Sequence, residues 1–298
     1  MDQHLQVFVT VVEKENFSRA AEELHMTQPA VSQYIRTLEN NIGTRLLERS
    51  NKYIRLNQVG EIVYHHAKEI LGLYTKMQTL VDDVTNVANG PISIGASYTF
   101  GEYVLPHILA NLQETYPGIQ PTVTIGNTTD IASLVDTHQL DAGIVEGNFN
   151  DQELMVEEFA EDQMVVVASP KHLLGEKKGF IDIIDLEKET WIVREKGSGT
   201  REATEKMFGQ LGIAPAKLMS FGSTQPIKES VGAGLGVSLL SKWAIQKELK
   251  YGDLNIVTMD GLPFSRQFSI VTKSPFQTKA LEVFISLLRD NRLLTTLE

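Results

Sequence analysis

The chain has 298 residues, 42% of them hydrophobic, which is more than one average domain needs and favours two or three domains. It has no cysteine, and this excludes disulfide bonds, thiol nucleophiles and cysteine-ligated zinc. The net charge is −11, but the first 90 residues nearly balance, with 9 basic against 11 acidic side chains. No run approaches the ~20 apolar residues of a membrane span. Asp2 and Glu13 do not suit a signal peptide. We therefore expect a cytoplasmic protein that does not contact a membrane.

Two short helices are predicted near the N-terminus. The first carries apolar residues at the spacing of one helix face: Leu5, Phe8, Val9 and Val12. Ser18 stands where an N-cap of the second helix is expected. Ala20, Ala21 and Leu24 then give this second helix a small apolar face for close packing.

A third helix follows Thr27, a second N-cap, with Pro29 in its first turn, where a missing N–H costs nothing. Its core-facing stripe is Val31, Ile35, Leu38 and Ile42. The opposite face carries Gln33 and Arg36, whose donors and acceptors match adenine and guanine edges in the major groove. A short helix, a turn and this helix together predict a DNA-reading helix-turn-helix. The alternative is the solvated face of an ordinary three-helix domain.

Basic residues collect directly after the third helix. The segment TRLLERSNKYIRLN has one acid, Glu48, among its cations: Arg45, Arg49, Lys52 and Arg55. Alternation over 53–56 predicts a short strand, and hence a wing beside the recognition helix. Cations on a wing would meet DNA phosphates, adding affinity that falls with salt. The alternative is a basic hairpin without a role in binding.

These residues carry a family resemblance. FVTVVEKENFSRAAEELHMTQPAVSQYIRTLENNIGTRLLER is similar, nearly position for position, to the N-terminal domain of LysR-type transcriptional regulators. Two departures are Asn16 and the run 57–60, Asn-Gln-Val-Gly, where Asn57 can still cap the next helix. The resemblance implies a winged helix-turn-helix over 1–58, a linker helix over 59–89 and an effector domain over 90–298. It implies DNA contacts from Ser18, Arg19, Thr27, Gln28, Pro29, Ser32, Gln33, Arg36, Arg49 and Lys52.

A long helix is predicted from Asn57 onward. Its apolar residues repeat at heptad spacing, and an isolated helix cannot bury such a seam: Val63, Ala67, Ile70, Tyr74, Met77, Val81 and Val84. We expect a homodimer, or the tetramer common in the family. Its paired DNA-binding domains would then read two half-sites of a pseudo-palindromic operator. Packing on the protein's own body is the alternative. His65 and His66 diverge by about 100° on a helix, so no metal site is expected.

Asn89-Gly90-Pro91 ends the predicted helix, and the sequence after it shows the pattern of an α/β domain. Helical patterns separate short β-rich runs, which predicts mainly parallel sheets with ligands at the strand ends. The family resemblance implies two lobes like those of periplasmic binding proteins, 90–161 with 267–298, and 162–266, with the effector between them. The nine runs are PISIGAS, PTVTIGN, DAGIVEG, QMVVVASP, TWIVREKG, KLMSFGS, GVSLLS, LNIVTMD and QFSIVTK.

Four strand-to-helix turns of this region are rich in hydroxyls, and hydroxyls beside helix N-termini suit anions. GSGTR at 197–201 also resembles a stretch of LysR-type regulators of sulfur assimilation and cysteine biosynthesis, whose effectors are small oxyanions or O-acetylserine. The alternative interpretation of GSGTR is that Thr200 simply caps the helix that follows, with no ligand involved. GAGLG at 232–236 lacks a nucleotide-binding context and is interpreted as a turn. The expected effector contacts are Ser97, Tyr98, Thr99, Thr128, Thr129, Ser198, Thr200, Arg201 and Thr224.

The sequence therefore predicts a LysR-type regulator that binds double-stranded promoter DNA and answers to a small anion or sulfur metabolite. We expect it to act as an activator that works with RNA polymerase, and to need no cofactor. A regulator that answers to an unrelated organic carboxylate is one alternative. A cytoplasmic solute-binding protein is another, and an enzyme is a third. No nucleophile elbow, metal-ligand spacing or paired-carboxylate motif in the sequence favours catalysis. The seven histidines are scattered along the chain and do not suggest a catalytic triad.

Overall fold

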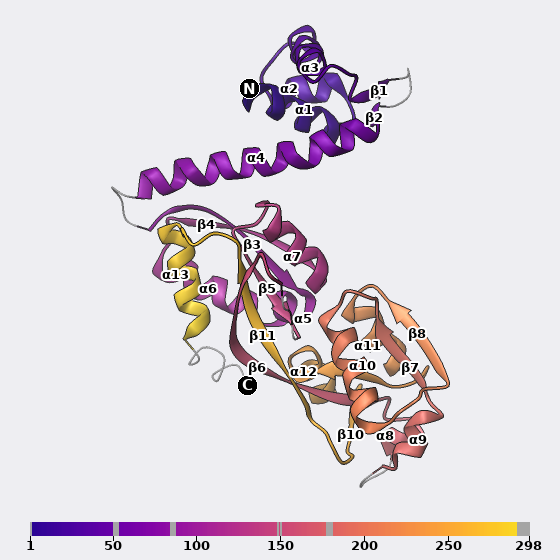
Figure 1. Cartoon of the computed structure of the whole chain (residues 1–298). Helices are drawn as coiled ribbons and strands as arrows, with labels where there is room; N and C mark the ends of the chain where they lie inside the picture. The colour runs from indigo at the N-terminus through magenta and orange to yellow at the C-terminus, as the bar shows by residue number, and fades with distance from the viewer. Residues whose placement is uncertain are drawn as a thin grey trace. The chain divides into compact units, whose positions relative to one another are not determined.

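The computed structural model describes residues 2–49, 54–83, 88–147, 149, 151–176 and 181–290 (Figure 1). Two compact units make up the chain. One comprises residues 1–85 with 137–139, and the other comprises residues 86–136 and 140–298. We call them the head and the sensor.

Three helices build the first part of the head: α1 (Asp2–Lys14), α2 (Phe17–Glu23) and α3 (Gln28–Ile42). Thr27 caps α3 as predicted, since its Oγ1 accepts from the N–H of Ala30 at 3.4 Å. The cap of α2 was predicted wrongly. Asn16, not Ser18, holds that position, and its Oδ1 accepts from the N–H of Ser18 at 2.8 Å and of Arg19 at 3.1 Å.

Removing the α2 cap should weaken the head measurably. Asn16→Ala leaves two N–H groups without their acceptor, and we expect the free energy of unfolding to fall by about 1 kcal/mol. Urea unfolding followed by circular dichroism measures this. The control is Asn41→Ala, which changes the same residue type at an exposed position in the last turn of α3 and should leave stability within about 0.5 kcal/mol. Equal midpoints for the two variants would contradict the cap.

The three helices close over one apolar core. Val31, Ile35 and Leu38 are buried as predicted, together with Phe8 and Ala20. Ile42, expected on the same stripe, is 46% exposed, because α3 ends there and the chain turns away at Gly43. The buried stripe therefore spans only the first three turns of α3, and the remaining surface of the helix faces solvent.

The predicted wing is present. Strand β1 (Leu47–Arg49) pairs antiparallel with β2 (Ile54–Leu56), in a register that places Glu48 opposite Arg55. Lys52 and Tyr53 lie outside the described residues. The hairpin follows α3 directly and leads into the next helix, so it lies between the recognition helix and the long helix in the chain.

Helix α4 (Gln58–Asp83) is the long helix. Val63 and Ala67 were predicted on its free seam, but they pack into the core of the head, and Ala67 is fully buried there. The seam is therefore rotated in this first part of the helix. Its later residues are exposed as predicted, and Val84 lies outside the described residues. The exposed apolar stripe comprises Val59, Ile62, Ile70, Leu73, Tyr74, Met77 and Val81.

All nine predicted β-runs of the sensor form strands. Seven belong to one sheet in the order β10-β6-β11-β5-β3-β4, with β9 paired to β6, while β7 and β8 form a separate pair. The strands are β3 (Gly90–Ser97), β4 (Ile119–Gly126), β5 (Ala142–Glu146), β6 (Met155–Ala168), β7 (Thr190–Arg194), β8 (Lys217–Phe221), β9 (Ser238–Ser241), β10 (Asn255–Val257) and β11 (Phe264–Thr272).

Helices of the sensor cover these sheets in two lobes with separate cores. The first lobe packs α5, α6 and α13 around Phe100, Ile108 and Phe284. The second lobe packs its helices around Trp191 and Met207. The helices are α5 (Tyr98–Tyr103), α6 (Leu105–Thr115), α7 (Thr128–Asp136), α8 (Leu173–Glu176), α9 (Ile183–Glu187), α10 (Gly199–Leu211), α11 (Thr224–Gly232), α12 (Lys242–Tyr251) and α13 (Lys279–Arg289).

The prediction of mainly parallel sheets was only partly right. Strands β3, β4 and β5 run parallel, as do β7 and β8. The long strands β6 and β11 instead run antiparallel to each other, from Phe264 opposite Met164 to Thr272 opposite Met155. They join the two lobes (Figure 1), because the chain leaves the first lobe along one and returns along the other. An out-and-back path of this kind requires antiparallel pairing.

The run GAGLG is a turn between α11 and β9, as predicted. Gly234 has φ +83°, a conformation that favours glycine. A Cβ on Gly236 would lie 2.0 Å from the carbonyl oxygen of Thr190, so only glycine allows this close approach to β7.

Candidate nucleic-acid interface and ligand site

The α2–α3 surface carries the side chains predicted to read DNA. Thr27, Gln28, Pro29, Gln33 and Arg36 are exposed at the start and on the outer face of α3. Ser32 is half-buried, and its Oγ accepts from Gln28 Nε2 at 2.9 Å. Ser18 and Arg19 are exposed in the first turn of α2. A guanidinium and two amides thus project from one helix face, which is the chemistry that reads base edges.

The wing adds positive charge beside this face. Arg45 precedes β1 and is exposed, and Arg55 is exposed on β2. Arg49 ends β1, while Lys52 lies outside the described residues. Arg45 and Arg55 can approach phosphates without reading sequence.

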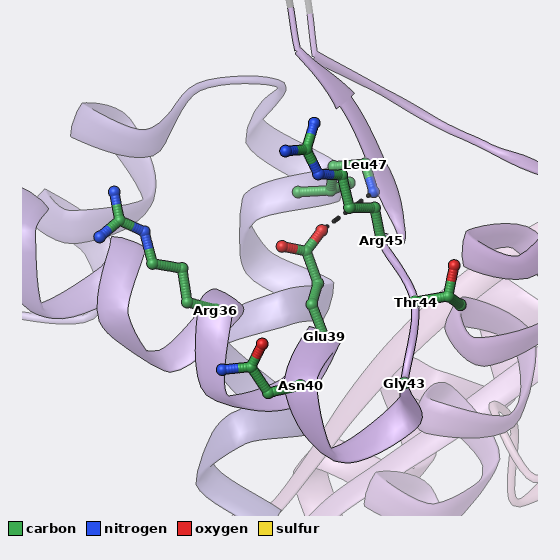
Figure 2. Close-up of a pocket in the computed structure, with 7 residues that line it drawn as sticks. All are labelled: Arg36, Glu39, Asn40, Gly43, Thr44, Arg45 and Leu47. Carbon is green, nitrogen blue, oxygen red and sulfur yellow. Dashed lines mark hydrogen bonds between the residues drawn. The ribbon is translucent and has the colours of Figure 1, made fainter.

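An open hollow of about 660 Å³ separates the end of α3 from the start of the wing (Figure 2). Glu39 stands within it, between the side chains of Arg36 and Arg45. Its Oε1 accepts from the N–H of Leu46 at 3.0 Å and of Leu47 at 3.4 Å. Sequence reasoning gave Glu39 no role, although an acid among basic residues at a DNA-binding surface is a signal that it serves structure.

In the sensor, several predicted ligand hydroxyls meet a buried guanidinium. Arg266 Nη2 donates to Thr99 Oγ1 at 2.9 Å, and Nη1 donates to Thr200 Oγ1 at 3.0 Å. The same Nη1 lies 2.7 Å from Glu146 Oε2, and Nε lies 2.7 Å from Asp162 Oδ2. Glu146 Oε1 also accepts from the N–H of Thr99 at 2.8 Å. The centre between the lobes therefore already contains two carboxylates and one cation.

The pKa values of these groups follow from burial and pairing. Burial alone would raise the pKa of Glu146, but the Arg266 charge and hydrogen bonds from Thr99 outweigh it and hold that pKa below its ordinary value. Burial raises the pKa of Asp162 despite Arg266 and Ser241. Burial opposes the charge of Arg266, but Glu146 and Asp162 raise its pKa. Glu146 and Arg266 thus form the ionised pair of this network.

A second pocket, of about 390 Å³, lies where α7 and α10 begin. Thr129 N–H donates to Gly197 O at 3.1 Å, and its Oγ1 donates to the same atom at 3.3 Å, which ties the two lobes together at the pocket. Ser198 caps α10 by accepting from the N–H of Thr200 at 3.2 Å. The pocket is lined by Thr128, Thr129, Phe149, Lys196, Gly197, Ser198, Gly199, Arg201, Glu202 and Glu205.

Charged groups of this pocket are partly paired. Arg201 Nε lies 2.6 Å from Glu205 Oε1, and Glu202 Oε1 lies 2.6 Å from Lys206 Nζ. Lys196 is exposed at the rim. The capping alternative for GSGTR assigned the cap to Thr200, but Ser198 is the cap, and Thr200 Oγ1 instead faces Arg266.

Two further predicted contacts, Tyr98 and Thr224, lie against Arg194, which sequence reasoning also missed. Its guanidinium lies 4.3 Å from the ring centroid of Tyr98, and Nη1 donates to Thr224 Oγ1 at 3.4 Å. Both Nε and Nη2 bind the carboxylate of Glu195 at 2.7 Å. Ser97 Oγ donates to Ile144 O at 3.2 Å. The structure thus brings the nine predicted residues to one region, but most of their polar atoms contact protein.

His65 and His66 have a neighbour that the sequence analysis overlooked. Glu69 Oε2 lies 2.6 Å from His66 Nδ1, and Glu69 Oε1 lies 3.9 Å from His65 Nε2. One ligand atom from each of His65, His66 and Glu69 lies within 4.8 Å of the other two, so the two histidines can share an ion despite their divergence on the helix. The expectation of no metal stays a prediction.

Comparison with known proteins identifies the family. Residues 3–61 match the bacterial regulatory helix-turn-helix protein, lysR family, and residues 85–292 match the LysR substrate binding domain. The chain belongs to the LysR family of transcriptional regulators. It is a DNA-binding regulator with an effector-binding domain, and its relatives are regulators, not enzymes.

Two similar regulators illustrate this membership. The HTH-type transcriptional regulator CysL of Bacillus subtilis is 38% identical and is matched over 96% of each chain. CfxR of Cupriavidus necator is 37% identical over 91% of this chain and 84% of its own.

Solved structures agree with the fold. A full-length OxyR variant from Pseudomonas aeruginosa has a TM-score of 0.73 at 25% identity, covering 97% of this chain and 95% of its own. The regulatory domain of Synechocystis CcmR in complex with 2-PG has a TM-score of 0.62 at 27% identity, covering 67% of this chain and 96% of its own. Among the described helices, none is long and apolar enough to cross a bilayer.

Proposed function

We propose that this regulator binds promoter DNA as a homo-oligomer in the cytoplasm and answers to a small anion, acting with RNA polymerase as an activator. Residues 1–58 would read DNA, 59–89 would pair copies, and 90–298 would sense. The pocket at the starts of α7 and α10 carries the anion part of the proposal. Partial positive charge at two helix N-termini, together with Lys196 and Arg201, favours an anionic group there.

Pairing through α4 is supported by its exposed apolar stripe. Met77 is 52% exposed and Val81 is 65% exposed in the later turns of α4, whereas Ala67 in its earlier turns is buried in the core that α1–α3 form. Exposed apolar residues at this density are costly in water and mark an association surface. A second copy of α4 would cover the stripe with a matching one, as in a two-helix seam.

The ligands of similar regulators define the anion panel. The CcmR domain was solved in complex with 2-PG. The GSGTR resemblance adds sulfate, sulfite, thiosulfate and O-acetylserine. An organic carboxylate remains the alternative effector class, so simple and aromatic carboxylates complete the panel.

Thermal unfolding of the full chain with each compound tests the proposal. A ligand of the folded sensor at 100 times its Kd stabilises by about 2.7 kcal/mol, and hence raises the Tm by a few degrees. We expect at least one small anion to do so. Lys196→Ala should weaken that anion's effect, whereas Lys247→Ala, which removes an exposed cation of α12 outside this pocket, should not. Stabilisation by bulky aromatic acids alone would contradict a small-anion effector.

A further inference from the structure

The segment Arg45–Leu47 joins the recognition helix to the wing and is held from the side of α3. Glu39, in the last turns of α3, accepts from the backbone N–H of Leu46 at 3.0 Å and of Leu47 at 3.4 Å (Figure 2). Both leucine side chains are buried in the core of the head. The carboxylate thus fixes two consecutive peptide groups relative to α3.

The start of α4 holds the same segment from another side. Asn57 Nδ2 donates to Arg45 O at 2.8 Å, and Asn57 N–H donates to Leu46 O at 3.1 Å. Asn57 Oδ1 accepts from the N–H of Gly60 at 2.8 Å, which caps α4. A Cβ on Gly60 would lie 2.1 Å from Leu46 O, so the first turn of α4 is pressed against the segment.

Three consecutive residues are therefore bonded to both helices. The N–H groups of 46 and 47 are taken by α3, and the carbonyls of 45 and 46 are taken by the residue that begins α4. Apolar packing of Val63 and Ala67 also holds α4 against the core that α1–α3 form, but this attraction has no preferred direction. Hydrogen bonds are directional, so these bonds to residues 45–47, which we call the joint, constrain the angle between α3 and α4.

We propose that Glu39 and Asn57 are positioning residues that set the angle between the recognition helix and α4, and so the half-site spacing that paired copies select. The proposal rests on the pairing through α4 proposed above. In a two-fold dimer, the separation of recognition helices must match the DNA helical repeat of about 34–36 Å per turn. A change of angle at this joint is multiplied along α4, because the rest of that helix extends beyond the joint.

Two variants loosen the joint, and two more serve as matched controls. Glu39→Ala removes the acceptor, while Glu39→Gln keeps an acceptor oxygen and should restore wild-type behaviour. Asn57→Asp keeps the cap of α4 but places a carboxylate against Arg45 O, where the amide donated. The controls are Glu22→Ala and Asn41→Ala, which remove the same residue types from exposed positions on α2 and α3.

The experiment measures binding of the full chain to duplexes with two half-sites, moved apart one base pair at a time. The half-site is the one that wild-type protein selects from random duplexes. We expect wild type, Glu39→Gln and both controls to favour one separation by about 10-fold or more over its neighbours, since one base pair rotates a half-site by about a tenth of a turn. Glu39→Ala and Asn57→Asp should flatten or shift this preference, with an unchanged salt slope, because the phosphate contacts remain.

The proposal is overturned if folded Glu39→Ala and Asn57→Asp both keep the wild-type separation. Circular dichroism reports folding, and if Glu39→Ala does not fold, Asn57→Asp decides the matter, since it keeps the cap of α4. Wild type without any spacing preference would contradict pairing itself, and the joint would then have nothing to set. If Glu22→Ala and Asn41→Ala lost the preference for one half-site separation as much as Glu39→Ala and Asn57→Asp do, the proposal would also be overturned.

Discussion

Arg266→Met is expected to lower the free energy of unfolding of the sensor by about 3–5 kcal/mol, the usual cost of removing one partner from a buried ion pair. The side chain is 2% exposed and lies 2.7 Å from both Glu146 Oε2 and Asp162 Oδ2. Methionine replaces the volume but leaves two buried carboxylates without a cation. Chemical unfolding followed by tryptophan fluorescence measures the loss for the sensor alone, because both tryptophans of the chain, Trp191 and Trp243, belong to that unit.

Arg289→Met is the matched control. Arg289 also binds a carboxylate closely, with Nε 2.8 Å from Glu157 Oε1, but both side chains are about half exposed. Screening by water limits such a pair to about 0–1 kcal/mol. Equal midpoints for the two variants would contradict a network in which Arg266 stabilises the centre of the sensor.

The same variant should change the pH dependence of stability. In wild type, the lowered pKa of Glu146 gives stability that is present above the ordinary carboxylate pKa and is lost as pH falls through the lowered value. Without Arg266, burial raises the carboxylate pKa values, so folding takes up protons at mildly acidic pH. The difference in the free energy of unfolding between wild type and Arg266→Met should therefore be smaller at pH 5 than at pH 7.5, when both are measured by chemical unfolding.

Replacing the base-reading side chains should abolish selectivity without unfolding the head. Gln33→Ala and Arg36→Ala each remove a side chain that is exposed on α3. We expect each to reduce discrimination between the selected duplex and random DNA by about 1–3 kcal/mol, and the double variant to lose most of it. Competition binding at fixed salt measures this ratio directly.

Arg55→Ala tests whether base recognition and phosphate binding are carried by different residues. Arg55 is exposed on the wing strand β2, and we expect it to contact phosphates rather than base edges. Its loss should weaken binding equally on selected and random duplexes and reduce the salt slope by about 0.9. If Arg36→Ala behaved in the same way as Arg55→Ala, α3 would not be the recognition helix.

The sequence was most informative where a pattern has only one physical meaning. Thr27 and Pro29 mark the start of α3, and all nine β-runs of the sensor were recognised, because short runs rich in β-branched residues and bounded by turn residues favour strands. The sequence was less informative where two neighbouring residues could fill the same role. Asn16 and Ser18 can both cap a helix, and only the backbone geometry decides between them. Val63 and Ala67 fit a free seam by spacing, but spacing cannot say which partner covers a face.

The centre of the sensor was predicted only in part. Hydroxyl-rich turns correctly located a polar region, but Arg266 lies 120 residues after Glu146 and 104 after Asp162, and no local pattern pairs them. A signal was present, since a charge within an apolar strand run must be paired once buried. Glu146 lies inside the run DAGIVEG, as the last residue of β5, and Arg266 directly precedes the run QFSIVTK. Glu39 was missed for a related reason, because its partners are backbone N–H groups that sequence does not display.

Selection of bound duplexes from a random pool by the full wild-type chain tests the central claim most directly, namely that paired heads on α4 read two half-sites with α3. The account predicts enrichment of an interrupted inverted repeat, whose binding weakens steeply as salt rises. Recovery of a pool with no common sequence, or of a single unrepeated site, would contradict it.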